Sequence, residues 1–231
     1  MLFRSEVQRF GVATVPIDLA KQIQRVNVLA PTEMCRVMTK WGSDKGWNAY
    51  TTLYSALFSE RRDQPLRVLE LGLGTNNLNV LSNMGVFGAP GASLRGWREL
   101  FPHALVYGAD VDSGILFEED RIKTFYCDQL DRSSIRELWL QPDLRDGMDI
   151  IIEDGLHTFE ANLSFLEESF GHLRPNGFYV TEDISGDCLD GWRKRLETLY
   201  SKQYPTYEFA LTRLTLRGCN LLVVHRKGDQ A

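Results

Sequence analysis

The stretch Val68-Leu-Glu-Leu-Gly-Leu-Gly-Thr-Asn76 decides the fold, because an apolar run passes directly into a turn that carries two glycines. A short apolar run of this kind predicts a strand that is buried inside a parallel sheet. Glycine allows the backbone to adopt positive φ and to approach a ligand closely. The turn alone is a weak signal, since Asn77 stands where the dinucleotide fingerprint needs its third small residue. A tight turn that only packs a helix on a sheet is the alternative interpretation.

The chain around this turn alternates between short apolar runs and amphipathic stretches. The apolar runs cover residues 66–71, 104–109, 122–127, 148–152 and 178–181. Helical patterns separate most of them, as at residues 133–140 and 159–173, and another apolar helix face lies at 47–60. Strands that alternate with helices predict a parallel sheet built from right-handed βαβ units.

The two ends of the chain differ from this middle part. After a helical pattern at 192–200, the runs 207–211 and 220–225 have no helix between them, which predicts an antiparallel hairpin. We therefore expect an α/β, Rossmann-like sheet of seven strands, mostly parallel, with an antiparallel terminal hairpin and helices on both faces. Residues 1–40 are expected to form an amino-terminal arm or lid, with a helix start at Pro31, and residues 41–231 a single domain.

Composition restricts the classes of partner. The 231 residues are 43% hydrophobic and 25% charged, which is ordinary for one globular domain. A net charge of −5 argues against a nucleic-acid partner, and no apolar run approaches the roughly 20 residues of a membrane span. The amino terminus lacks a secretory signal, and the four cysteines are scattered, as in reduced proteins. We expect a cytoplasmic protein, and leave a homo-oligomer open.

Polar side chains suited to a nucleoside follow three successive strands. Glu70 lies in the first strand, Asp110 ends the second, and Asp128 with Gln129 ends the third. An acid at the end of the second strand is the usual partner of ribose hydroxyls, although 40 residues separate Glu70 from Asp110 instead of about 20. The extra length lies in residues 82–98. It is either a surface insertion or a loop over the site whose arginines, such as Arg95, meet an anion.

Acids also follow the next two strands, in Asp154-Gly-Leu-His157 and in Glu182-Asp183. The carboxyl edge of a parallel sheet is where ligands bind, so these side chains should converge on one crevice. Carboxylates suit Mg²⁺ or Mn²⁺, and His157 could act as a general base. The alternatives are a helix N-cap for Asp154, solvated loop acids for Glu182 and Asp183, and a structural histidine. The remaining histidines, His103, His172 and His225, are expected at the surface or in packing.

Such a site could activate a hydroxyl group. A divalent ion that binds a hydroxyl lowers its pKa, and a neighbouring imidazole can remove the proton as the oxygen attacks an electrophile. If the electrophile is a methyl sulfonium, the reaction is an in-line methyl transfer, which depends mainly on proximity and orientation.

Seven short motifs together resemble the class I S-adenosylmethionine-dependent methyltransferases, and within them the Mg²⁺-dependent sugar O-methyltransferases of macrolide biosynthesis. The resemblance covers about residues 40 to 226. It rests on Gly42-Ser-Asp-Lys-Gly46, Glu70-Leu-Gly-Leu-Gly74, Ser93-Leu-Arg-Gly-Trp97, Gly108-Ala-Asp-Val-Asp112, Asp128-Gln129, Asp154-Gly-Leu-His157 and Glu182-Asp183. The fold it implies is a seven-stranded sheet with a reversed last strand.

The resemblance also implies roles for the matching residues. It implies S-adenosylmethionine and Mg²⁺ (or Mn²⁺) as cofactors, His157 as the base, and Asp154, Glu182 and Asp183 as the metal ligands. The implied cofactor-binding residues are Asp44, Lys45, Tyr50, Tyr54, Glu70, Gly72, Gly74, Asn76, Arg95, Asp110, Asp128, Gln129 and Asp154. The acceptor would be a sugar hydroxyl of a glycosylated natural product, or else a saccharide of a polysaccharide or glycolipid. The macrolide enzymes carry an additional amino-terminal domain, so acceptor recognition by that domain is not carried over.

Four other functions remain as alternatives. A nicotinamide-dependent oxidoreductase conflicts with the missing third glycine of the dinucleotide fingerprint and with the terminal hairpin. A non-catalytic cofactor-binding protein conflicts with the complete set of three acids and His157. A catechol-type phenol O-methyltransferase would act on catechols without needing His157. A metal-dependent hydroxylase of an antibiotic pathway would depend on oxygen.

Overall fold

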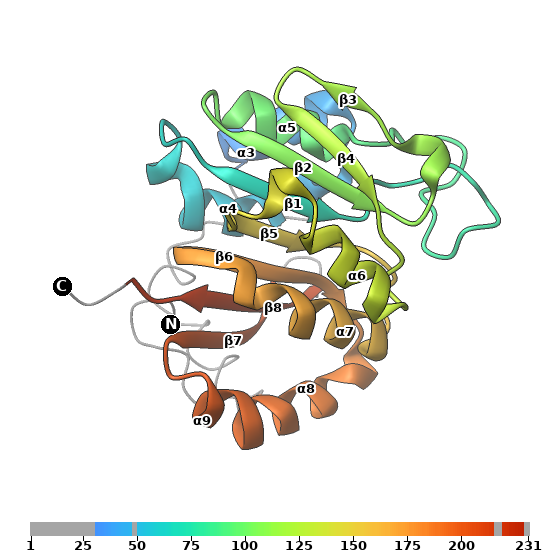
Figure 1. Ribbon diagram of the computed structural model, residues 1–231. Coiled ribbons are helices and arrows are strands. Elements are labelled where there is room, and N and C mark those ends of the chain that lie inside the picture. The colour runs from blue at the N-terminus through green and yellow to red at the C-terminus, as the bar shows by residue number, and fades with distance from the viewer. Residues whose placement is uncertain (1–30, 48–49, 215–218, 229–231) are drawn as a thin grey trace.

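The strands form one sheet with β1 near its middle. The computed structural model describes residues 31–47, 50–214 and 219–228, and its sheet has the order β3-β4-β2-β1-β5-β6-β8-β7 (Figure 1). The strands are β1 (Arg67–Leu71), β2 (Leu105–Asp110), β3 (Glu118–Glu119), β4 (Ile122–Tyr126), β5 (Met148–Glu153), β6 (Leu173–Ile184), β7 (Tyr207–Leu214) and β8 (Cys219–Arg226). Strands β1, β2, β4, β5 and β6 run parallel, and β8 is antiparallel to both β6 and β7.

All seven predicted strands are present, and the predicted mostly parallel sheet with its terminal hairpin is confirmed. The eighth strand, β3, was not predicted, because it has only two residues and leaves no pattern in the sequence. It pairs antiparallel with β4 at the sheet edge.

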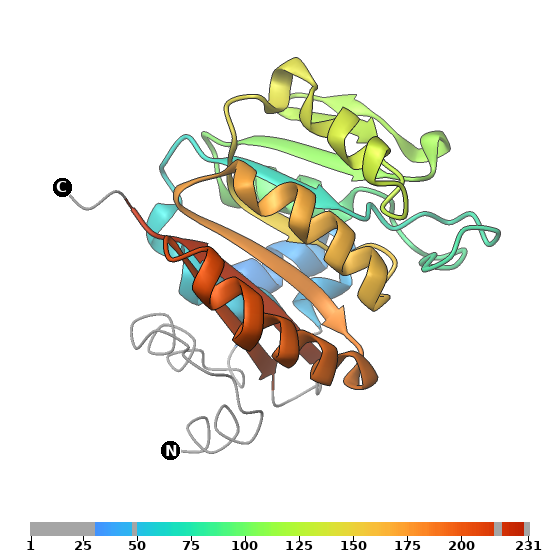
Figure 2. The same cartoon turned by 60° about the horizontal axis from the view of Figure 1, so that its bottom comes forward.

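Helices cover both faces of the sheet, as expected (Figure 2). On one face lie α3 (Glu33–Trp41), α4 (Tyr50–Phe58) and α5 (Ala92–Leu100); on the other lie α6 (Arg132–Trp139), α7 (Phe159–Ser169) and α8 (Leu189–Arg195). A π-helical turn (Leu196–Tyr200) and α9 (Ser201–Gln203) extend α8. Alternate residues of one strand therefore enter opposite cores, with Val68 in the first and Leu69 in the second. This explains why β1 and β5 are buried along their whole length and read as continuous apolar runs.

The structure differs from two expectations, one about the insertion at residues 82–98 and one about the amino-terminal arm. The predicted insertion at residues 82–98 is a loop only up to Gly91, after which α5 begins and buries Leu94 and Trp97 in the first core. Of the predicted arm, residues 1–30 lie outside the described part of the chain. Its remainder contains α3, which begins after the N-cap Thr32 and buries Met34 and Met38 against the same core.

Two further observations concern the described residues alone. No helix among them is both long and apolar enough to cross a membrane. Cys35, Cys127 and Cys188 are free thiols, as predicted.

Candidate active site

The carboxyl ends of the parallel strands open into a pocket of about 400 Å³. That volume is within the range of small-molecule sites. Nine of the predicted site residues line it: Asp44, Gly72, Gly74, Asp110, Asp128, Gln129, Asp154, His157 and Asp183. These predicted residues thus lie together at one edge of the sheet. Residues 79–84 form another wall of the pocket, and they overlap the start of the segment 82–98, for which a loop over the site was one of the two expectations.

The turn after β5 presents Asp154 and His157 to this pocket. His157 has φ 61°, and Asp183, at the end of β6, has φ 49°. Left-handed backbone costs energy in residues other than glycine and is concentrated at functional sites. The N-cap of α7 is Thr158, whose hydroxyl accepts from the amide of Ala161. The carboxylate of Asp154 is therefore not used to cap this helix.

A buried clamp holds the same turn, and one of its members, Glu153, was not among the predicted site residues. Glu153, the last residue of β5, is fully buried and accepts from the side-chain amide of Gln129 at 2.6 Å. The carbonyl oxygen of Gln129 accepts in turn from the amide of Leu156 at 2.9 Å. Burial raises the pKa of Glu153 to about 7. Gln129, expected at an adenine, thus also ties the second half of the turn to β5.

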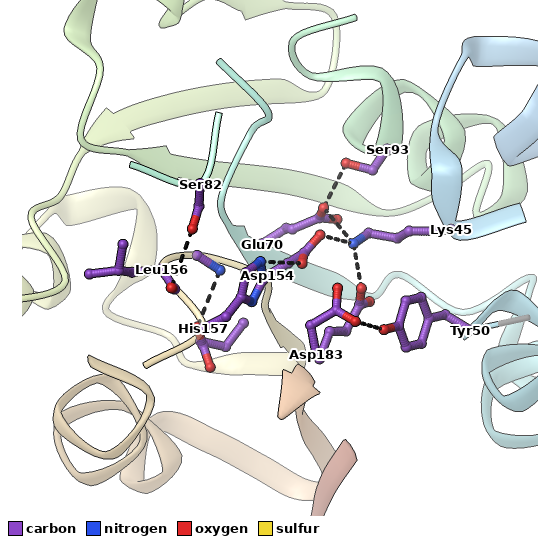
Figure 3. A network of polar contacts seen from close by, with 12 residues as sticks. Lys45, Tyr50, Glu70, Ser82, Ser93, Asp154, Leu156, His157 and Asp183 are labelled. Atoms are coloured by element: carbon purple, nitrogen blue, oxygen red, sulfur yellow. Dashed lines mark hydrogen bonds and ion pairs between the residues drawn. The ribbon is translucent and has the colours of Figure 1, made fainter. Parts of the chain in front are cut away.

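Asp154, His157 and Asp183 form a group with the character of a cation site. One ligand atom of each lies within 4.8 Å of the others, and His157 Nε2 is 3.8 Å from Asp154 Oδ1 (Figure 3). Asp183 accepts a hydrogen bond from the hydroxyl of Tyr50 on α4. Two carboxylates and one imidazole suit a small divalent cation, so the side chains present fit such a group.

Glu182, the third predicted metal ligand, lies deeper. It is buried, and its two oxygens accept from the ammonium of Lys45 at 2.8 Å and from the hydroxyl of Tyr54. Burial raises the pKa of Glu182 well above its usual range, although Lys45 opposes the shift. In this structure Glu182 therefore joins the sheet edge to α4 and to the segment before it.

Lys45 is the centre of the buried charge cluster. Its Nζ lies 3.4 Å from Glu70 and 2.8 Å from Glu182, and it also contacts Asp154. Burial alone would lower the pKa of Lys45, but the nearby carboxylates raise it well above its usual value. One ammonium thus faces three carboxylates, and the pKa of Asp44 beside them is raised by burial and by the charges of Asp154 and Asp183. The cluster has an excess of negative charge.

Glu70, in β1, is a fixed member of the same cluster. Its two oxygens accept from the Ser93 hydroxyl at 2.7 Å and from the Trp97 indole at 2.6 Å, both on α5. Burial raises the pKa of Glu70. The motif around Ser93 and Trp97 therefore serves to orient this acid.

The glycine turn after β1 is shaped by close packing. Gly72 has φ +93°, and a Cβ there would lie 1.9 Å from the carbonyl oxygen of Asp154, so only glycine fits. Asp110 accepts from the amide of Leu73 at 2.7 Å, which holds this turn against the end of β2. Asn76 donates to the carbonyls of Gly85 and Gly88, and so shapes the loop whose residues 79–84 form a wall of the pocket.

Some predicted residues do not reach the pocket. Arg95 is absent from its lining, and its guanidinium pairs with Glu119 at 2.7 Å. The structure therefore places this arginine in a surface ion pair. Outside the site, His172 stacks on Trp139 and His225 on Phe178, in agreement with packing roles.

Comparison with known proteins finds sequence similarity to several O-methyltransferases. It matches no protein-family model. The 8-demethyl-8-alpha-L-rhamnosyl tetracenomycin-C 2'-O-methyltransferase of Streptomyces olivaceus is 35% identical over 144 residues, which are 62% of this chain and 35% of that protein. The demethylmacrocin O-methyltransferase of Streptomyces fradiae is 37% identical over 146 residues, 63% of this chain and 33% of that protein. The matched segment thus spans only about a third of either relative.

A solved structure has the same fold. The MycE methyltransferase of the mycinamycin biosynthetic pathway, in complex with Mg and SAH, superimposes with a TM-score of 0.64 and 24% identity, over 86% of this chain and 56% of that chain. The predicted resemblance to the macrolide sugar O-methyltransferases is thus confirmed in sequence, and the Rossmann-like methyltransferase fold is confirmed in structure.

Proposed function

We propose that this chain carries the methyl-transfer site of a divalent-metal-dependent, S-adenosylmethionine-dependent O-methyltransferase that acts on a sugar hydroxyl of a glycosylated small molecule. The observation that carries the proposal is the group of Asp154, His157 and Asp183 at a pocket that begins at the glycine turn of β1. The relatives are all named as O-methyltransferases, one of them of a rhamnosyl compound, and they support the same reaction class.

The pocket suits S-adenosylmethionine in size and charge. Its acids, Asp44, Asp110 and Asp128 among them, favour a ligand with a sulfonium and an ammonium group. We expect Glu70, Gly72, Gly74, Asp110 and Asp128 to bind this cofactor, with Asp44, Lys45, Tyr50 and Tyr54 beside it.

The metal site proposed here consists of Asp154 and Asp183, with Glu182 behind them. The excess of negative charge in the buried cluster favours a divalent cation such as Mg²⁺ or Mn²⁺. When bound, the ion supplies electrostatic stabilisation of the acceptor oxygen as its proton leaves.

His157 is proposed as the general base. Its Nε2 faces Asp154 across 3.8 Å, so a hydroxyl held at these carboxylates would lie within reach of the imidazole. The clamp between Gln129 and Glu153 holds the turn that carries His157, whose backbone is left-handed. Nothing in the relatives favours the catechol-type or hydroxylase alternatives.

The test is methyl transfer from labelled S-adenosylmethionine to a panel of glycosides, with Mg²⁺ or with a chelator. We expect transfer that needs the metal and is lost in Asp154→Asn. Asp190→Asn is the matched control, because Asp190 is exposed and pairs with Arg193 in the next turn of the same helix. Transfer that is unaffected by both the chelator and Asp154→Asn would refute the proposal.

A further inference from the structure

We propose that Lys45 is a built-in competitor of the metal: its ammonium pairs with Asp154 and Glu182 in the metal-free protein, and the divalent cation binds by displacing it. The inference rests on the metal site proposed above and adds a step of cation exchange to it.

The first observation is that the ammonium already holds two of the three predicted metal ligands. Lys45 Nζ contacts Asp154 (Figure 3). It also lies 2.8 Å from Glu182. The other oxygen of Glu182 accepts from the hydroxyl of Tyr54. Both oxygens of Glu182 thus already accept a hydrogen bond, one of them from a cation, so a metal ion bound there would lie next to the Lys45 ammonium.

Charge makes joint occupancy unfavourable. A lysine ammonium and a divalent ion on the same Asp154 carboxylate would repel each other, and solvent screens this repulsion little on the buried side of Asp154, where Lys45 and Glu182 lie. The side chain of Lys45 is 2% exposed, so water cannot take over its solvation in place. One cation should therefore leave as the other arrives.

The structure offers the displaced ammonium a second partner. Glu70 lies 3.4 Å from Lys45 Nζ on the side of α5, where Ser93 and Trp97 hold its carboxylate. A short shift of the Lys45 side chain would release Asp154 and Glu182 and leave its ammonium paired with Glu70. A buried charge stays paired throughout, which avoids the large cost of an isolated ion.

The backbone around Lys45 is fixed, so the movement belongs to the side chain. A Cβ on Gly46 would lie 2.4 Å from the Thr39 hydroxyl and 2.6 Å from the Cys35 carbonyl. The hydroxyl of Thr51 donates to the Lys45 carbonyl at 3.2 Å. These contacts tie the short 3-10 turn Asp44–Gly46 to α3 and α4 and leave the four-carbon stem of Lys45 as the part that can move.

The test compares Mn²⁺ binding to the wild type, Lys45→Met and Lys40→Met by calorimetry in the absence of cofactor. We expect Lys45→Met to bind Mn²⁺ about tenfold more tightly or better, because no ammonium has to be displaced. Lys40→Met removes an exposed lysine that pairs with Glu99, and its affinity should stay within about twofold of the wild type. Equal affinity of Lys45→Met and wild type would overturn the exchange and leave the metal site intact.

A second experiment separates displacement from simple loss of a nearby positive charge and does not depend on Lys45→Met folding. In wild-type protein labelled with ¹⁵N-lysine, the buried ammonium should give a slowly exchanging NMR signal, assigned by its absence in Lys45→Arg. We expect Mg²⁺ to shift this signal in proportion to saturation. An unchanged signal at full metal occupancy would mean that Lys45 stays in place, which overturns the inference.

Glu182→Gln completes the test. Once Lys45 has moved, Glu182 should be a ligand, so this variant should bind Mn²⁺ about tenfold more weakly or worse. Unchanged affinity would restrict the site to Asp154, His157 and Asp183 and contradict the exchange. No binding to the wild type or to Lys45→Met would refute the proposed metal site itself.

Discussion

At the scale of single residues, the structure separates side chains that the sequence had grouped. Asp154, Glu182 and Asp183 are equivalent in the sequence, since all three follow apolar runs. In the structure, Asp154 and Asp183 face His157, whereas Glu182 is buried against Lys45 and Tyr54. The position of these acids at the ends of strands could be predicted. How deeply each carboxylate is buried depends on Lys45, which lies 109 residues from Asp154 in the chain. No local pattern contains that contact.

The role of His157 leads to the first prediction. His157→Ala should reduce kcat by about 10²–10⁴-fold, the usual contribution of a general base, while the affinity for S-adenosylmethionine changes little. Steady-state kinetics combined with a binding titration measures both quantities. His103→Ala, which removes an exposed histidine outside the site, is the control. Turnover close to that of the wild type in His157→Ala would exclude the base.

The clamp leads to the second prediction. Gln129→Leu would leave the amide of Leu156 without its partner and Glu153 with the Gly155 amide in place of two donors, which should cost roughly 2–4 kcal/mol of folding stability. The turn that carries His157 would lose its support, so kcat should fall more than cofactor affinity. Urea unfolding and the separate kinetic constants measure these effects. If cofactor affinity fell most, Gln129 would be an adenine contact, as the resemblance to the family implies.

At the scale of elements, apolar continuity made the parallel strands predictable, because helices bury both faces of β1 and β5. The same criterion missed β3, which is two residues long, and the start of α5, which follows a glycine-rich loop. The anchoring of α5 through Ser93 and Trp97 to Glu70 depends on contacts 23 and 27 residues apart. Spacing within a single segment could not have shown these contacts.

The glycine turn between β1 and the loop at residues 79–84 leads to the third prediction. Gly72→Ala should destabilise the protein by about 2 kcal/mol or more, because it adds left-handed strain to a clash with the Asp154 backbone. It should also weaken S-adenosylmethionine binding. Gly171→Ala is the matched control, since a Cβ there meets nothing within 4 Å. Equal unfolding midpoints for the two variants would show that the turn is not tightly fixed.

At the scale of the whole molecule, the sheet brings more acids than basic groups together from four strand ends. Because a bound metal ion offsets this negative charge, it should stabilise the folded protein. At a Mg²⁺ concentration of about 100 times its Kd, linkage adds about 2.7 kcal/mol, or roughly 5–10 °C in Tm for a chain of this size. Thermal melts with Mg²⁺ and with a chelator measure this shift. Asp154→Asn should show a smaller shift, and a wild-type Tm that does not respond to the metal would contradict the site.

A calorimetric titration of S-adenosylmethionine into the purified protein, with NAD⁺ as the comparison, shows whether the pocket is built for that compound. We expect saturable binding at one site per chain, with a Kd in the range of about 1–100 μM, and no heat from NAD⁺. Heat from NAD⁺ alone, or no binding of S-adenosylmethionine, would contradict the methyltransferase assignment.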